Sequence, residues 1–329
     1  MAKTYPNQQL GAGELIKNSY GKINTNSNAI NADVTELYAQ DADFEAQLTQ
    51  IINETDLDPN KDPEVTNARD SSVFGSFDTV KLRVDNTDNK VDTIESTLLN
   101  NAGAHNSLFR DKNLGTSVTA TQYANITNGT FEDMYIGDYW VVGGVNWRIA
   151  AFNYYRNTGD TLVPLNHITI VPDTQLYAHA MNATNITTGG YVGSNMYAVG
   201  LDTAKTTISG IFGTHLIKHR QILSNATASG KASGWAWFDS EIDLMNETMI
   251  YGSCVWGGST IGGSGYNIGV GKSQLPLFAL NPQSINTRQD YWLRDIVSAS
   301  QITFVGSRGD AHFTNASGIL GVRPVFSIS

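Results

Sequence analysis

The sequence has few of the residues on which several classes of protein depend. Cys254 is the only cysteine among 329 residues, so the chain can form neither an internal disulfide nor a metal site built from several cysteines. No run approaches the roughly 18–20 apolar residues of a membrane span, and residues 1–6 lack the apolar segment of a secretory leader. These absences predict a protein without membrane insertion or Sec-dependent secretion.

Charged side chains are also scarce, and they are unevenly distributed. Asp, Glu, Lys and Arg make up 16% of the chain, whose formal net charge is −10. Residues 1–130 hold 18 acidic and 10 basic side chains, against 13 and 11 in the remainder, so the excess acid is N-terminal. Neither part has the basic face that nucleic-acid binding requires. The near-neutral C-terminal part, rich in Tyr, Trp and Asn, favours an uncharged ligand such as a glycan and is also compatible with a protein receptor.

The first fifty residues carry apolar side chains at heptad spacing. One position of each heptad is always apolar and the alternate position usually is, with Ser27 and Asp41 as interruptions; the apolar members are Ile16, Tyr20, Ile23, Ile30, Val34, Leu37, Phe44, Leu48 and Ile51. This spacing predicts a coiled coil, whose seam only partner chains can bury. A single amphipathic helix packed on a domain is the alternative.

Proline and polar segments divide the N-terminal part further. Residues 56–63 contain two prolines, which end helices, so a linker is predicted over 56–72. A second heptad pattern begins at Val73 and ends at Leu98, and residues 102–130 are polar and rich in turn formers. The predicted organisation is therefore a coiled-coil or docking helix at 1–55, the linker, a second coiled-coil segment at 73–101, a neck at 102–130 and a head at 131–329.

From about residue 135 the pattern changes to that of strands. Residues 139–142 and 147–152 flank a Gly-Gly turn and predict a hairpin. Further strands are predicted at 167–171, 301–307 and 321–329. A helix is predicted over 203–223, and a shorter amphipathic helix over 241–251, where Glu241 would lie in the first turn that favours acids. The predicted class of the head is α+β.

Short motifs in the head resemble those of bacterial and phage domains with a C-type-lectin-like fold. The motifs are Gly-Asp-Tyr-Trp at 137–140 with Trp-Arg-Ile at 147–149, Ile-Thr-Ile-Val at 168–171, Tyr-Trp-Leu-Arg at 291–294 and Gly-Val-Arg-Pro-Val at 321–325. The resemblance covers residues 131–329 and extends to the variable receptor-binding proteins of diversity-generating retroelements, including the phage major tropism determinants. It implies a C-type-lectin-like head on a coiled-coil stalk, without catalysis.

The N-terminal part resembles baseplate and tail-tip proteins of phages that infect Gram-positive bacteria. Ala-Arg at 68–69, Phe-Gly-Ser-Phe-Asp-Thr-Val at 74–80 and Arg-Val-Asp at 83–85 carry this resemblance. The two resemblances together imply a homotrimeric phage receptor-binding protein, made in the host cytoplasm and located in the virion. Its implied partners are other tail or baseplate proteins, docked through the N-terminal helix, and a glycan or protein of the bacterial surface. The alternative is a structural fibre or upper-baseplate connector whose head contacts other virion proteins.

Candidate ligand contacts are aromatic or polar side chains in the loops of the head. The resemblance places the ligand-facing region around the last strands, between residues 292 and 321. A Gly-rich loop at 255–267 adds aromatic rings of the kind on which sugars stack; an ordered surface or trimer-contact loop is the alternative. The candidates are Trp256, Tyr266, Asn267, Gln301, Arg308, Asp310, His312 and Asn315.

Two tryptophans and two arginines of the head motifs have a structural interpretation. Trp140 and Trp292 are predicted to pack in the core. Arg294 and Arg323 are then predicted to be held by carbonyls or carboxylates, because an unpaired buried charge is costly. They are therefore not proposed as ligand contacts.

No catalytic, cofactor or metal site is predicted. Residues 269–273 lack the first glycine of a phosphate loop. His215 and His219 are four residues apart on the predicted helix but have no evident third ligand. Residues 308–310 form an Arg-Gly-Asp triplet that predicts a turn. Neither a nucleophile elbow nor a pair of catalytic carboxylates is recognisable.

Overall fold

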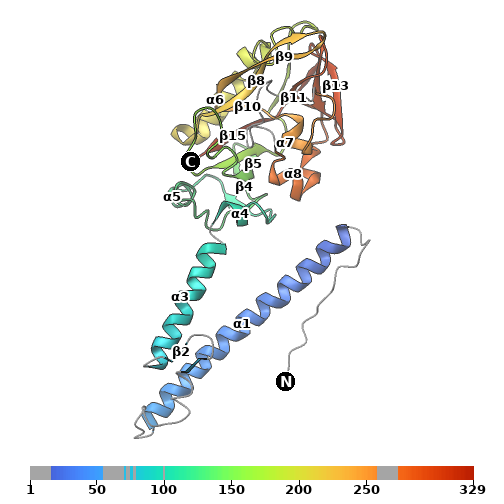
Figure 1. The fold of residues 1–329 in the computed structure, drawn as a ribbon. Helices are drawn as coiled ribbons and strands as arrows, with labels where there is room; N and C mark the ends of the chain where they lie inside the picture. Colours follow the sequence, from blue (N-terminus) through green and yellow to red (C-terminus); the bar gives the residue numbers. More distant parts are fainter. Residues whose placement is uncertain (1–15, 55–69, 72–74, 77–78, 99–100, 258–272) are drawn as a thin grey trace. The chain divides into compact units, whose positions relative to one another are not determined.

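The computed structural model describes residues 16–54, 70–71, 75–76, 79–98, 101–257 and 273–329. The chain divides into two compact units, residues 1–90 and 91–329 (Figure 1). Over the described ranges, no helix combines the length and the apolar character that crossing a membrane requires.

The first unit contains one long helix, as predicted. In the described middle of helix α1 (Ile16–Glu54), most heptad side chains face solvent, with Ile30 57% and Leu37 64% exposed. Among the described residues nothing covers these apolar side chains, and helices gain most of their stability from such packing. A coiled coil remains a prediction, because α1 is seen here as a single helix.

The second predicted coiled-coil segment begins later than expected. Helix α3 (Val80–Leu98) starts at Val80, and the preceding residues include strand β2 (Gly75–Ser76), which pairs antiparallel with β1 (Asp70–Ser71). Thr79 accepts a hydrogen bond from the backbone N–H of Leu82 at 3.1 Å, as an N-cap does. The prediction of a helical segment from Val73 was therefore wrong for residues 75–76. Gly75 and Ser76 are poor helix formers.

The second unit contains two mixed sheets, which confirms the α+β class in outline. In the six-stranded sheet only the β3–β4 pair is parallel; the strand order is β10 (Ile242–Leu244), β15 (Pro324–Ile328), β6 (Ile168–Pro172), β5 (Val145–Phe152), β4 (Tyr139–Val142) and β3 (Asn113–Gly115). In the five-stranded sheet only β11–β14 is parallel; the order is β13 (Ala311–Asn315), β12 (Gln301–Val305), β11 (Tyr291–Ile296), β14 (Ile319–Val322) and β7 (Tyr177–Ala180).

Short helices and a long hairpin complete this unit (Figure 1). The hairpin consists of β8 (His219–Ala228) and β9 (Lys231–Ser240). The helices are α4 (Ala102–His105), α5 (Ala120–Asn128), the π-helix η1 (Met196–Gly200), α6 (Asp202–Phe212), the 3₁₀ turns η2 (Gly213–His215) and η3 (Pro282–Ile285), α7 (Glu247–Tyr251) and α8 (Pro276–Leu280). Strand β3 and helix α5 fall within the range predicted as a neck.

The core lies on both faces of the five-stranded sheet. Tyr291 and Leu293 belong to the larger cluster, which also contains residues of the six-stranded sheet, whereas Trp292 lies in a second cluster. Strand alternation explains this division, since successive side chains point to opposite faces. Trp140 and Trp292 are fully buried, as predicted.

The buried arginines are satisfied as predicted. Arg294 donates to the carbonyl of Leu244 at 2.8 Å. Arg323 donates to the carbonyls of Pro172 at 2.8 Å and Ser284 at 3.0 Å. Backbone oxygens thus hold both guanidinium groups, with Arg323 fully buried and Arg294 6% exposed.

Two helix predictions were partly wrong. The helix predicted over 203–223 ends at Phe212, and Gly213, with φ of 53°, follows it. From Ile217 to Leu223 every second side chain is buried, the period of a strand. In the range 241–251 the helix begins only at Glu247, after strand β10 and the N-cap Asn246. Glu241 is therefore not in a helical first turn.

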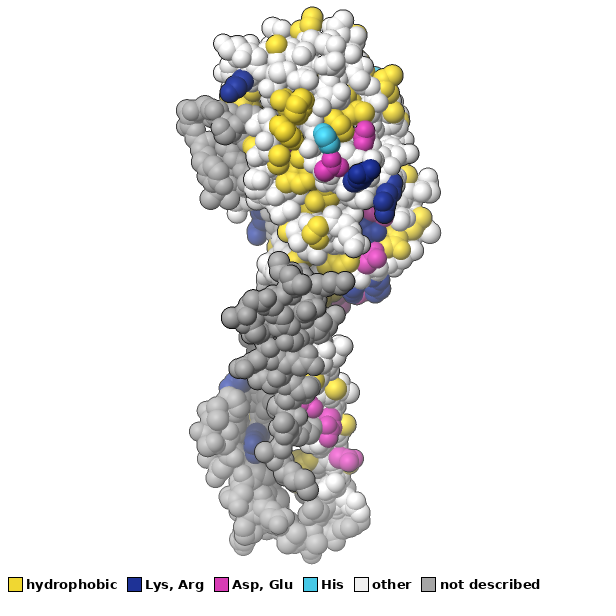
Figure 2. Space-filling view, turned by 90° about the vertical axis from the view of Figure 1, so that its right-hand side faces the viewer, with side chains coloured by type: hydrophobic (Ala, Val, Ile, Leu, Met, Phe, Trp, Pro, Cys, Tyr) yellow, Lys and Arg dark blue, Asp and Glu magenta, His cyan; other side chains and the backbone are white. Residues whose placement is uncertain are grey.

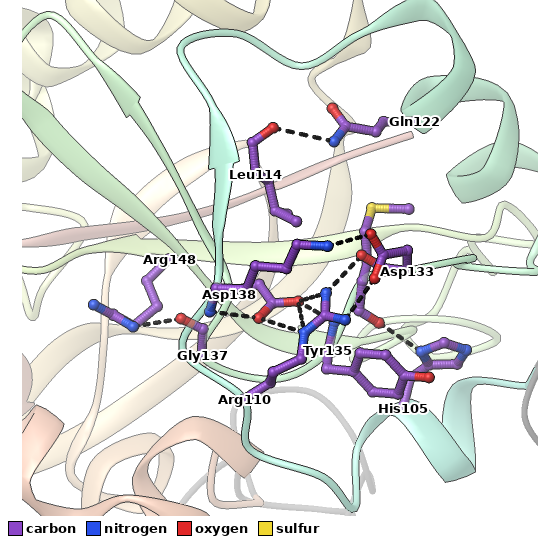
Figure 3. A network of polar contacts seen from close by, with 11 residues as sticks. His105, Arg110, Leu114, Gln122, Asp133, Tyr135, Gly137, Asp138 and Arg148 are labelled. Carbon is purple, nitrogen blue, oxygen red and sulfur yellow. Dashed lines mark hydrogen bonds and ion pairs between the residues drawn. The ribbon is translucent and has the colours of Figure 1, made fainter. Parts of the chain in front are cut away.

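A charged network fixes residues 110–112 to the loop that precedes β4 (Figure 3). The guanidinium of Arg110 donates to Asp138 at 2.6 Å and to Asp133 at 2.5 Å, and it lies 4.6 Å from the centre of the Tyr135 ring. Asp138 is fully buried and also accepts the backbone N–H of Lys112 at 2.8 Å. Arg110 is thus the cation that neutralises a buried carboxylate.

Replacing Arg110 by Ala is expected to lower the free energy of unfolding by about 2–3 kcal/mol, because Asp138 would keep its backbone donors but lose its counter-charge. Lys112→Ala is the matched control, since the Lys112 ammonium bonds only the exposed Asp133 and should be worth at most about 1 kcal/mol. Urea denaturation of both variants measures the difference. Equal losses would show that Arg110 does not stabilise Asp138.

Candidate functional site

The predicted contact residues at 301–315 lie on one hairpin, formed by β12 and β13. Gln301 is the cross-strand partner of Asn315, and Phe304 is that of His312. The turn at 306–310 is closed by a 2.8 Å hydrogen bond from the backbone N–H of Gly306 to the carbonyl of Asp310. The predicted Arg-Gly-Asp turn is therefore confirmed, and Gly309 supplies its left-handed residue with φ of 89°.

The side chain of Trp256 reaches this hairpin from a different part of the chain. Its indole N–H donates to the carbonyl of Ala311 on β13 at 2.9 Å, and its ring meets the Phe313 ring edge-on at 4.9 Å. Trp256 remains 46% exposed. An aromatic ring is thus fixed at the edge of the five-stranded sheet with part of its surface available to a ligand.

Glu247, on α7, fixes the backbone that carries Trp256. Its carboxylate is fully buried and accepts the N–H groups of Val255 at 3.0 Å, Trp256 at 3.1 Å and Gly257 at 2.8 Å. Three donors converging on one carboxylate form a strong, charge-assisted anchor. Tyr251, at the other end of α7, donates to a carbonyl of the hairpin turn, so the same helix positions both parts of the site.

A second acid lies beside Glu247. The carboxylate of Asp295, at the end of β11, accepts the backbone N–H of Glu247 at 2.6 Å. Burial raises the pKa of Asp295 to about 7, and the negative charge of Glu247 adds to this effect. The pair was not predicted. Asp295 directly follows the Tyr-Trp-Leu-Arg motif, but no sequence pattern distinguishes Glu247 from the other acids of the head.

The candidate residues divide between the two faces of the hairpin. His312 stacks on its partner Phe304, with 5.5 Å between the ring centres, on the face that also holds Trp292. Gln301 and Asn315 lie an odd number of residues from Phe304 and His312 along their strands, so their side chains point to the opposite face. Phe313 and Trp256 lie on that face as well. The hairpin therefore offers a Trp256 face and a His312 face.

Charges at this site are few and concentrated near the turn. His312 lies 2.7 Å from Asp310, and both side chains are about half exposed. Arg308 is exposed in the turn, and no bond from its guanidinium is seen to any described residue. Figure 2, which views the side of the molecule where β13 lies in Figure 1, shows mostly uncharged polar and hydrophobic atoms on this face of the head.

The structure thus brings together six of the eight predicted contacts. Tyr266 and Asn267 lie outside the described residues. The remaining six surround one hairpin and combine indole, amide, imidazole, carboxylate and guanidinium groups. Because they divide between two faces, one ligand would meet only part of this set; on the Trp256 face it could stack on the indole and exchange hydrogen bonds with the amides.

The histidine pair considered on the predicted helix is not a pair in the structure. His215 lies in a 3₁₀ turn, stacks on Tyr123 and bonds the carbonyl of Ser329 at 2.8 Å, whereas His219 is buried in β8 against Tyr155. Among the described residues, no group of three or more metal-binding side chains is found.

Comparison with protein-family models, with curated protein sequences and with solved structures finds no match to this chain.

Proposed function

We propose that the protein is a phage receptor-binding protein, or its counterpart in a phage-like particle, which attaches the particle to a glycan or protein of the bacterial surface without catalysis. Helices α1 and α3 form the two coiled-coil segments of a trimeric stalk that docks to other tail proteins, and the C-terminal unit is a C-type-lectin-like head. The protein is then a component of the virion. The two sequence resemblances carry the family assignment.

The observation that best supports a binding head is the fixed position of Trp256. A side chain bonded through its indole N–H, anchored through its backbone by Glu247 and still 46% exposed presents a preorganised ring. Preorganisation reduces the entropy lost on binding, and exposed Trp is a frequent energetic centre of interfaces.

We assign the ligand to the Trp256 face of the hairpin. This face combines the indole with the side-chain amides of Gln301, whose oxygen already accepts from the Ser298 hydroxyl at 3.2 Å, and of the exposed Asn315; such amides donate to and accept from sugar hydroxyls or peptide groups. On the other face, His312 is already engaged with Phe304 and Asp310. Weak individual sites suffice, since three linked heads raise the apparent affinity by about a hundredfold or more.

Trp256→Ala is expected to weaken binding of the labelled full-length protein to a susceptible strain at least about tenfold, because a central aromatic contact is worth more than 1 kcal/mol. His312→Ala should change it less than about twofold. Leu162→Ala alters another exposed apolar side chain and serves as control. The measurement is saturation binding to a panel of Gram-positive strains, with thermal unfolding to confirm folding.

Two other results would change the proposal. Loss of binding with His312→Ala alone would move the ligand to the His312 face. Full binding by every variant would remove the hairpin as the receptor site. If no strain binds the intact trimer, the role as a fibre or connector that contacts other virion proteins becomes the better account.

A further inference from the structure

A small cavity lies in the second unit, away from the hairpin just described. Its volume is about 200 Å³, and it is bordered by the segment that joins β9 to β10, by η1 and by the first turn of α6. Tyr197 and Leu201 contribute apolar surface from η1 and its end, and Ile242 contributes it from β10. The volume is below the roughly 300–1,000 Å³ typical of drug-sized ligands, so the cavity suits a single small molecule.

The polar floor of the cavity is rigid. Asp243 is 1% exposed, and its carboxylate accepts hydrogen bonds from the hydroxyls of Tyr191 and Ser240 and from the backbone N–H of Leu244. Ser240 in turn accepts from the side chain of Gln221 at 3.3 Å. Apart from Gln221 Oε1, which has no partner among the described residues, these groups are bonded to one another, and the bonds hold the floor in shape without a ligand.

The rim carries charged side chains of both signs, and two of them have no hydrogen-bond or ion-pair partner among the described residues. Lys205 contacts Asp202 at 3.4 Å, and Asp239 is bonded to Arg220 at 2.7 Å. Lys218 and Glu241 form no hydrogen bond or ion pair with any described residue. A cation and an anion that border one cavity without bonding each other leave both free to meet a ligand.

We infer that this cavity binds a small zwitterion, a molecule of about one sugar ring in size that carries both an ammonium and an anionic group. Glu241 pairs with the ammonium and Lys218 with the anion, while the body of the ligand rests on Tyr197 and Ile242. Charge-assisted hydrogen bonds of this kind are about twice as strong as neutral ones. The site is separate from the hairpin and does not depend on the receptor-binding function proposed above.

Four probes separate the two charges of the ligand. Glucosamine 6-phosphate carries both, glucosamine carries only the ammonium, glucose 6-phosphate carries only the anion, and glucose carries neither. Titration of the full-length protein, followed by calorimetry, is expected to show glucosamine 6-phosphate binding at least about tenfold more tightly than glucose. Each singly charged sugar should lie between them.

The substitutions Glu241→Gln and Lys218→Gln should each remove one preference. Glu241→Gln is expected to abolish the gain from the amino group and to retain the gain from phosphate, and Lys218→Gln is expected to do the reverse. Trp256→Ala should leave all four affinities unchanged, which separates this site from the hairpin. Absence of saturable binding by glucosamine 6-phosphate, or equal affinities for all four sugars, would overturn the inference, as would selectivity that survives both substitutions.

Discussion

A chain in which Ile30 and Leu37 are both replaced by Asp is expected to be monomeric and to bind receptor-bearing cells about a hundredfold more weakly than the unaltered protein. Both residues belong to the heptad seam of α1, and both are more than half exposed in the isolated helix. Charges in the seam of a coiled coil oppose association because they would have to be buried without partners. Sedimentation velocity measures the oligomeric state, and saturation binding measures the loss of avidity.

A matched variant distinguishes the effect of charges in the seam from a general loss of helix stability. Ala32→Asp with Ala39→Asp adds the same two charges to α1, seven residues apart, at exposed positions outside the heptad seam. Ala is the best helix former, so these substitutions disfavour the helix more than those in the seam. This control is expected to remain trimeric. If both double variants dissociate, helix stability rather than seam packing determines assembly, and an unaltered chain that is already monomeric would refute the proposed stalk.

Some strands of the head could be predicted from local sequence, whereas the single strand predicted at 321–329 is divided between β14 and β15, which belong to different sheets. Residues 139–142 and 147–152 carry β-branched and aromatic side chains on either side of a Gly-Gly turn, and the predicted hairpin is confirmed, although its second strand already begins at Val145. The range 203–223 was more ambiguous, since its apolar residues fit a helix period as far as Phe212 and a strand period from Ile217. Gly213 was the only local sign of the change.

The site was only partly predictable, because several of its contacts join residues that are far apart in the sequence. The turn at 308–310 is encoded by neighbouring residues and was predicted. The anchor of Trp256 depends on Glu247, Asp295 and Ala311, which are brought together only by the fold. Likewise, the assignment of His312 and Asn315 to opposite faces requires the register of β12 and β13. A single sequence carries no local signal for either.

Acidification is expected to destabilise the C-terminal unit by about 1.4 kcal/mol per pH unit between pH 6 and pH 4.5, the slope of one net proton taken up on unfolding. Burial lowers the pKa of His167 to about 4. Burial and the neighbouring charge of His167 lower that of His219 to about 3. Both histidines therefore gain a proton on unfolding below their ordinary value of about 6.5, so their contribution is present above that pH and is lost as the pH falls. Asp295, with its pKa raised to about 7, has the opposite effect, because it releases its proton on unfolding.

Two variants separate the contributions of the histidines and of Asp295. For each variant the measured quantity is the change of the free energy of unfolding per pH unit, which does not depend on how stable the variant is at neutral pH. Asp295→Asn removes the opposing carboxyl, so its slope should rise to about 2.7 kcal/mol per pH unit. His219→Gln removes one titrating histidine, so its slope should fall to near zero.

Ion pairing lowers the pKa of Asp133, Asp160 and Asp173, and these carboxylates add to acid sensitivity only near and below their ordinary value of about 4. Urea denaturation between pH 4.5 and pH 6 therefore reports mainly on His167, His219 and Asp295. An unchanged slope in Asp295→Asn would mean that Asp295 releases no proton on unfolding in this range, contrary to the raised pKa of this carboxyl.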